Sequence, residues 1–90
     1  MKIVWDEPKR LANLVKHGLD FADLDDVFFA DAFILSTGRP KRWMGIGANQ
    51  SGVIVVVFVR LGREGVSVIS MRVASKKERS LYREKLKEEG

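Results

Sequence analysis

The side chains in this sequence that could carry chemistry are mostly basic. They comprise two arginines in strand-like segments, a Lys-His pair, and an arginine and a tyrosine near the C-terminus: Arg60, Arg72, Lys16, His17, Arg79 and Tyr82. An arginine can stabilise the negative charge that grows on a phosphate, while a second group moves protons at the attacking and leaving oxygens. The set therefore suits cleavage of a phosphodiester without a metal.

Other kinds of site are poorly supported. The chain has one histidine and no cysteine, and its carboxylates lack a ligand-like spacing, which argues against a metal site. The glycine-rich stretch "GIGANQSG" lies between two strand-like segments rather than before a helix, so it does not predict a phosphate-binding loop. No serine lies in a nucleophile-elbow context. We therefore expect neither a metal nor a cofactor.

Structural roles remain open for the same residues. Arg72 can cross the sheet edge with its stem while its head stays solvated. Tyr82 can pack in the core with its hydroxyl at the rim. Lys16 and His17 fall where a helix is expected to end, and there they complement the helix dipole, with Gly18 as a left-handed cap. Glu78 is accounted for by a capping box with Ser75.

The charge distribution favours an anionic partner. The net charge is +4, and residues 46–90 carry nine Lys/Arg against five Asp/Glu, whereas seven of each cancel in residues 1–45. A basic half favours nucleic acid, although a charge of this size also serves solubility. The stretch "DFADLDDVFFAD" has five aspartates and would repel phosphate, so RNA is expected elsewhere. The lack of cysteine and of a long apolar segment predicts a soluble, cytoplasmic single domain over residues 1–90.

The elements that must position these side chains begin with helices. "KIVW" predicts a short strand, and "DEP" starts a helix with Asp6 as the N-cap. A helical spacing predicts that its buried stripe contains Leu11, Leu14 and Val15. A second short helix is expected from Asp20, with an apolar face formed by Phe21, Leu24, Val27 and Phe28.

Four strand-like segments and a final helix follow. The strands are "AFILS", "RWMGIGA", "VIVVVFVRL" and "VSVISMRVA", and the third should be central because it is apolar throughout. The helix is "SKKERSLYREKLKEE", with an inward face of Leu81, Tyr82 and Leu86. The predicted class is α+β: a small antiparallel sheet, two N-terminal helices and one C-terminal helix, with the helices on one face of the sheet.

The hairpin between the last two strands decides whether two arginines act together. Opposed residues of an antiparallel pair share a face. Arg60 and Arg72 would lie on one face with an odd number of loop residues, and on opposite faces with a two-residue turn at Arg63 and Glu64. The sequence leaves both registers open.

Two segments resemble the BrnT family of toxins from type II toxin-antitoxin systems. The first is "VWDEPKRLANLVKHGLDFADLDDVF", which contains the pattern W-D-x-x-K-x-x-x-N-x-x-K-H-G, and "RW" and a glycine follow it. The second is "ISMRVASKKERSLY". The matching positions are Trp5, Asp6, Lys9, Asn13, Lys16, His17, Gly18, Phe21, Ile69, Ser70, Arg72, Ala74, Glu78, Arg79 and Tyr82.

The resemblance implies a RelE-like fold and a ribonuclease that cleaves RNA and so inhibits translation and growth. It also implies a BrnA-like antitoxin that binds DNA, with two toxin-antitoxin pairs joined into a dimer. The family often has a glutamate where this chain has Lys41, before the "RW" segment. An alternative is a non-catalytic module that binds an antitoxin-like partner or nucleic acid. A weaker alternative is a DNA-binding regulator that inserts a β-ribbon into the major groove.

Overall fold

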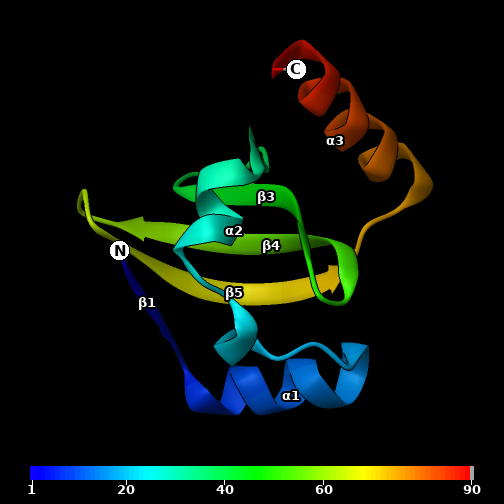
Figure 1. The fold of residues 1–90 in the computed structure, drawn as a ribbon. Coiled ribbons are helices and arrows are strands. Elements are labelled where there is room, and N and C mark those ends of the chain that lie inside the picture. The colour runs from blue at the N-terminus through cyan, green and yellow to red at the C-terminus, as the bar shows by residue number, and fades with distance from the viewer. Residues whose placement is uncertain (90) are drawn as a thin grey trace.

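The computed structural model describes residues 1–89, and it shows one sheet with helices on both sides (Figure 1). The elements are β1 (Lys2–Trp5), α1 (Glu7–His17), η1 (Phe21–Asp23), α2 (Asp26–Asp31), β2 (Phe33–Ser36), β3 (Arg42–Asn49), β4 (Gly52–Leu61), β5 (Gly65–Val73) and α3 (Lys76–Glu89). The predicted α+β class is confirmed. Within residues 1–89, no helix is long and apolar enough to span a membrane.

The sheet has the strand order β1-β5-β4-β3-β2, which places β4 at its centre as expected. The strands β2 to β5 form the predicted antiparallel meander, whereas β1 pairs with β5 in parallel over Gly65 to Val68 only. Beyond Val68, that edge of β5 faces α1 (Figure 1). The sheet is therefore mixed, because β1 joins its outer edge in parallel while the other strand pairs are antiparallel.

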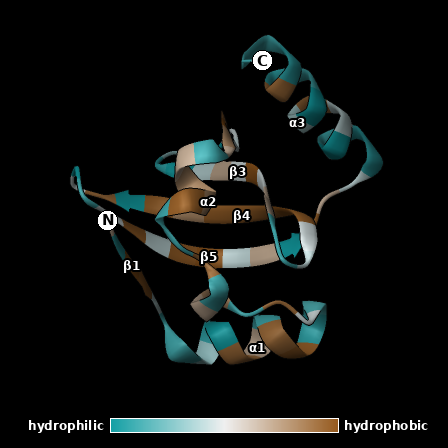
Figure 2. Ribbon diagram, in the orientation of Figure 1, coloured by the Kyte–Doolittle hydropathy of each residue, from teal (hydrophilic) through white to brown (hydrophobic). Residues whose placement is uncertain are grey.

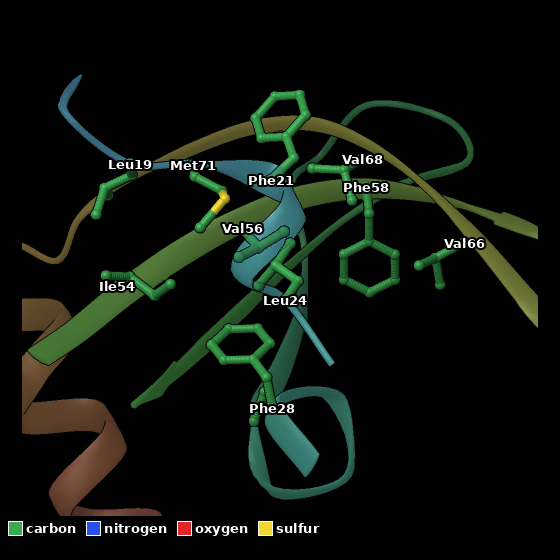
Figure 3. Packing of buried hydrophobic residues seen from close by; sticks show 11 residues of the cluster. Leu19, Phe21, Leu24, Phe28, Ile54, Val56, Phe58, Val66, Val68 and Met71 are labelled. Carbon is green, nitrogen blue, oxygen red and sulfur yellow. The ribbon is translucent and has the colours of Figure 1, made fainter. Parts of the chain in front are cut away.

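The prediction that all helices cover one face was wrong. Along β4, alternate residues belong to two separate clusters. Ile54, Val56 and Phe58 pack beneath η1 and α2, on what we call the α2 face (Figure 3). Val55 packs with Tyr82 on the opposite side, which we call the α3 face. β4 is apolar along most of its length (Figure 2), and such a strand needs cover on both sides. Tyr82 of α3 contributes to the cover on the second side.

The first helix ends as predicted but turns a different side inward. Gly18 is left-handed with φ 69°, and its N–H donates to the carbonyl of Leu14. Val15, expected in the buried stripe, is 89% exposed, and Leu11 and Leu14 are also exposed. Instead Asn13 is buried: its Oδ1 accepts from the Met71 N–H at 3.0 Å and its Nδ2 donates to the Leu19 carbonyl. An unpaired strand edge needs polar partners, and this requirement orients α1.

The predicted second helix is two short helices. Leu24 is extended with ψ 145°, which ends η1 before α2 begins. Asp20 accepts from the Ala22 N–H, and Asp25 accepts from the Phe28 N–H, so each aspartate caps its own helix. The break turns Val27 outward, where it is 66% exposed, while Phe21, Leu24 and Phe28 are buried as predicted.

The last helix starts with the predicted capping box. The Glu78 N–H donates to Ser75 Oγ at 3.2 Å, and the Ser75 N–H donates to Glu78 Oε1 at 2.8 Å. Tyr82 packs against the sheet and is 8% exposed, as predicted for the inward face of α3. Leu81 and Leu86 were predicted on the same face, but both are exposed. At the far end, Lys85 Nζ donates to the carbonyls of Asp31 and Ala32. These bonds hold α3 over the β2–β3 side of the sheet.

Candidate functional site

The two strand arginines point to opposite faces of the sheet. The β4–β5 loop has three residues, Gly62 to Glu64, an odd number that by itself would place both arginines on one face. However, Val57 pairs with Ser70 and Phe58 with Val68, which leaves Ile69 as a β-bulge. The extra residue reverses the alternation of β5 beyond it. Arg60 therefore points to the α2 face, and Arg72, opposite Val55, points to the α3 face.

Arg72 is held by an ion pair that the sequence analysis did not anticipate. Its Nη1 and Nη2 donate to the two carboxylate oxygens of Glu78 at 2.7 and 2.8 Å. Glu78 thus has a second role beyond the capping box. The hydrogen bonds from Arg72 and the Ser75 N–H hold the Glu78 pKa to about 2, against burial, which raises it. The same pair raises the pKa of Arg72, so both groups stay charged.

The guanidinium of Arg72 keeps donors for a further ligand. A guanidinium has five N–H groups, and the Glu78 carboxylate uses two of them. The Arg72 side chain is 41% exposed, whereas Glu78 is only 15% exposed. The carboxylate therefore fixes the orientation of the guanidinium while part of it stays open to solvent.

The other C-terminal candidates lie on the same side but in different environments. Arg79 is half-buried, and its Nη1 donates to the Ala74 carbonyl at 3.0 Å, which braces the junction between β5 and α3. Tyr82 belongs to the buried cluster with Ile46 and Val55. The structure thus gives Arg79 and Tyr82 clear packing roles beside Arg72.

Lys16 and His17 lie beside Ser70 in a groove along the free edge of β5. The groove has a volume of about 290 Å³, and its lining includes Lys9, Asn13, Lys16, His17, Ile69 and Ser70. His17 is half-buried and Lys16 is exposed. Ser70 and Arg72 point to the same face of the sheet, about 7 Å apart along the strand. Ser70 therefore lines the groove that contains the Lys-His pair, and it shares its face of the sheet with Arg72.

An uncovered part of the α3 face adjoins this group. Val55 is buried with Tyr82. Because α3 lies over β2 and β3, four other residues on the β4–β5 part of that face are half-buried: Val57, Val59, Ser67 and Ser70. In the sequence, Ser70 is only one of the positions that match the family pattern, and this surface was not predicted. The apolar sequence of β4 predicts cover on both faces. It does not indicate that α3 would lie over β2 and β3 instead of over β4 and β5.

The site suits anion binding rather than metal binding. In residues 1–89 no three side chains of His, Asp or Glu come together in a group that could hold a metal ion.

Lys41 lies in the turn before β3 with φ 64° and is exposed. The next residue, Arg42, pairs with Val59, whereas Arg72 pairs with Val55, so Lys41 lies at least about 13 Å from the Arg72 row. The substitution at Lys41 does not remove a neighbour of Arg72.

The fold agrees with comparisons to known proteins. Residues 5–78 match the family model described as "Ribonuclease toxin, BrnT, of type II toxin-antitoxin system". The chain belongs to the BrnT family. A crystal structure of the Brucella abortus ribonuclease toxin BrnT is 52% identical, with a TM-score of 0.77 over 84% of this chain and 99% of that one. No match was found among the curated proteins.

Family membership supports the toxin among the functions that the sequence left open. The chain is a ribonuclease toxin of a type II toxin-antitoxin system, and its partner is accordingly an antitoxin. The structure brings five of the six candidate residues toward the α3 face and the adjoining edge of β5, and it excludes Arg60 from that group.

Proposed function

We propose that this toxin is a metal-independent endoribonuclease whose site lies on the open part of the α3 face. The observation that carries the proposal is the oriented and partly exposed guanidinium of Arg72. Arg72 shares its face of the sheet with the half-buried Ser70, and Ser70 lines the groove that contains Lys16 and His17.

In the proposed reaction the 2′-hydroxyl of RNA attacks the adjacent phosphorus and loses its proton to His17. The bond from phosphorus to the 5′-oxygen breaks, and that oxygen takes up a proton, which Lys16 or solvent supplies. The products are a 2′,3′-cyclic phosphate and a free 5′-hydroxyl. Arg72 stabilises the charge on the phosphate oxygens, and the half-buried Arg79 assists from the start of α3.

The remaining candidate acts through packing. Tyr82 anchors α3 to the sheet beneath Arg79 and so keeps Glu78 in place beside Arg72. We therefore assign Tyr82 a positioning role. RNA cleavage of this kind would stop translation and growth, and it places the toxin in the cytoplasm together with its substrate. The partner in this proposal is a BrnA-like, DNA-binding antitoxin, with toxin-antitoxin pairs joined as a dimer.

The test is cleavage of a single-stranded RNA by the purified chain in excess EDTA, followed by analysis of the product ends. We expect 5′-hydroxyl and cyclic phosphate ends, and no cut at a position that carries a 2′-deoxy substitution. Loss of cleavage in EDTA would overturn the metal-independent mechanism. Absence of cleavage at a high ratio of protein to RNA, with antitoxin binding retained, would instead support the non-catalytic module.

A further inference from the structure

A second pocket lies on the α2 face, at the end of the sheet where the β4–β5 hairpin turns. It has a volume of about 360 Å³, within the range of small ligand sites. The lining is mixed, and it includes four apolar side chains and two arginines: Phe29, Ile34, Phe58, Val66, Arg60 and Arg63. None of these side chains belongs to the group around Arg72, so the proposed ribonuclease site does not account for the pocket.

The walls of this pocket are part of the main core. Phe58 is 2% exposed and Val66 is 5% exposed, and both belong to the buried cluster (Figure 3). Phe29 and Ile34 pack against the same cluster. The rings of Phe29 and Phe58 meet edge to face with centroids 5.3 Å apart. Because Phe58 and Val66 are almost fully buried, the half-buried Phe29 and Ile34 supply most of the apolar surface that a ligand could contact. Their packing against the core leaves that surface little freedom to collapse.

The mouth of the pocket is positively charged. Arg60 lies over the Trp43 ring, 5.3 Å from its centroid, and both Arg60 and Arg63 are exposed. Among residues 1–89, no carboxylate lies within ion-pair distance of either guanidinium. By contrast, the N-terminal ammonium group beside the pocket is paired with Asp26. The two arginines are therefore the charges available to an anionic group entering here.

We propose that this pocket binds an apolar side chain from an acidic segment of the antitoxin. The inference rests on the toxin-antitoxin membership, and it does not require the ribonuclease mechanism above. An apolar floor suits an aliphatic or aromatic side chain, and carboxylates beside that side chain pair with Arg60 and Arg63. A nucleobase would fit less well, because its polar edges would lose hydrogen bonds against Phe58 and Val66. Arg60 is then a partner-recognition residue.

The test measures binding of the co-purified cognate antitoxin to charge-reversal variants. We expect Arg60→Glu and Arg63→Glu each to weaken binding at least tenfold, because the new carboxylate repels the acidic segment. Arg83→Glu is the matched control on exposed α3 and should bind within twofold of the wild type. Circular dichroism checks that all three variants are folded. Unchanged binding by the first two, or equal loss with the control, would overturn the proposal.

A peptide and an RNA separate the two possible sources of an anion. The probes are a blocked acidic octapeptide with a central Leu-Phe, the same peptide with Ser-Ser at the centre, and an octauridylate. In ¹⁵N NMR spectra we expect the Leu-Phe peptide alone to shift the amides of Gly62, Gly65 and Val66. Equal shifts with the Ser-Ser peptide, or larger shifts with RNA, would contradict an apolar anchor. A wild-type chain that fails to cleave RNA would leave these binding results unaffected.

Discussion

The α2 face and the α3 face of the same sheet differ in how completely they are covered. On the α2 face, η1 and α2 bury Ile54, Val56 and Phe58, and a pocket lies at the end near Arg60. On the α3 face the helix is displaced over β2 and β3, which leaves Ser70 and Arg72 at an open surface. One face thus holds most of the buried apolar residues, and the other has room to present charge to a ligand.

A single extra residue separates the two arginines between these faces. Without the bulge at Ile69, the three-residue hairpin loop would align Arg60 and Arg72 on one side. With the bulge, Arg72 meets Glu78 at the start of α3, while Arg60 meets the Trp43 ring. Two residues of one type on paired strands therefore have different surroundings and, in our proposals, different partners.

Removing each arginine in turn tests whether Arg60 and Arg72 have different roles, and it should give the largest effect. Arg72→Ala should lower the rate of RNA cleavage about 100- to 1000-fold, because a preorganised charge at the phosphate is lost. Arg60→Ala should leave that rate within about threefold. The measurement is single-turnover cleavage with enzyme in excess over RNA. A folded Arg72→Ala variant that cleaves like the wild type would remove Arg72 from the mechanism.

The junction of α1 with the free edge of β5 should be the next most sensitive point. Asn13→Ala should lower the free energy of unfolding by about 1–3 kcal/mol, because it leaves the Met71 N–H and the Leu19 carbonyl buried without partners. The measurement is urea denaturation followed by circular dichroism. If the variant unfolds at the same urea concentration as the wild type, these two bonds do not orient α1.

The Arg72–Glu78 pair predicts a smaller effect with a defined pH dependence. Glu78→Gln keeps a capping side chain but should cost about 1 kcal/mol at neutral pH, because the ion pair is lost at a partly exposed site. The folded Glu78 pKa of about 2 lies below the ordinary 4.5, so this stabilisation is complete above pH 4.5 and disappears as the pH falls toward 2.

Denaturant titrations of the wild type and of Glu78→Gln across that range are the check. The difference between the two proteins should shrink from pH 5 to pH 2. A difference that stays constant with pH would mean that the carboxylate charge does not stabilise this junction.

The smallest effect is expected where the sequence predicted a buried stripe. Val15→Ser should change the free energy of unfolding by no more than about 0.5 kcal/mol, since Val15 is 89% exposed. Thermal unfolding of the variant beside Asn13→Ala makes the contrast on one helix. A loss from Val15→Ser as large as that from Asn13→Ala would mean that the outer side of α1 is covered in solution.

The sequence predicted what depends on neighbours along the chain. The end of α1 at Gly18, the capping box at Ser75 and Glu78, and the four consecutive strands were predicted correctly, because local hydrogen bonds and alternation determine them. Asp6 lies at the N-cap as predicted, but its side chain makes no capping hydrogen bond. The family was recognisable from the segments around His17 and Arg72. The break at Leu24 was missed, although Asp20 and Asp25 each signal a helix start.

The inward sides of α1 and of β5 beyond Ile69 depend on contacts between segments that are distant in the sequence. Helical spacing cannot tell that α1 meets a strand edge, where unpaired backbone groups favour Asn13 over Val15. The residue types around Ile69 do not predict a bulge, yet the bulge places Arg60 and Arg72 on different faces of the sheet. The candidate side chains and the order of the strands and helices could therefore be predicted from the sequence. Packing between distant segments decided which of those groups share a surface, because a shift of one residue exchanges the two faces of a strand.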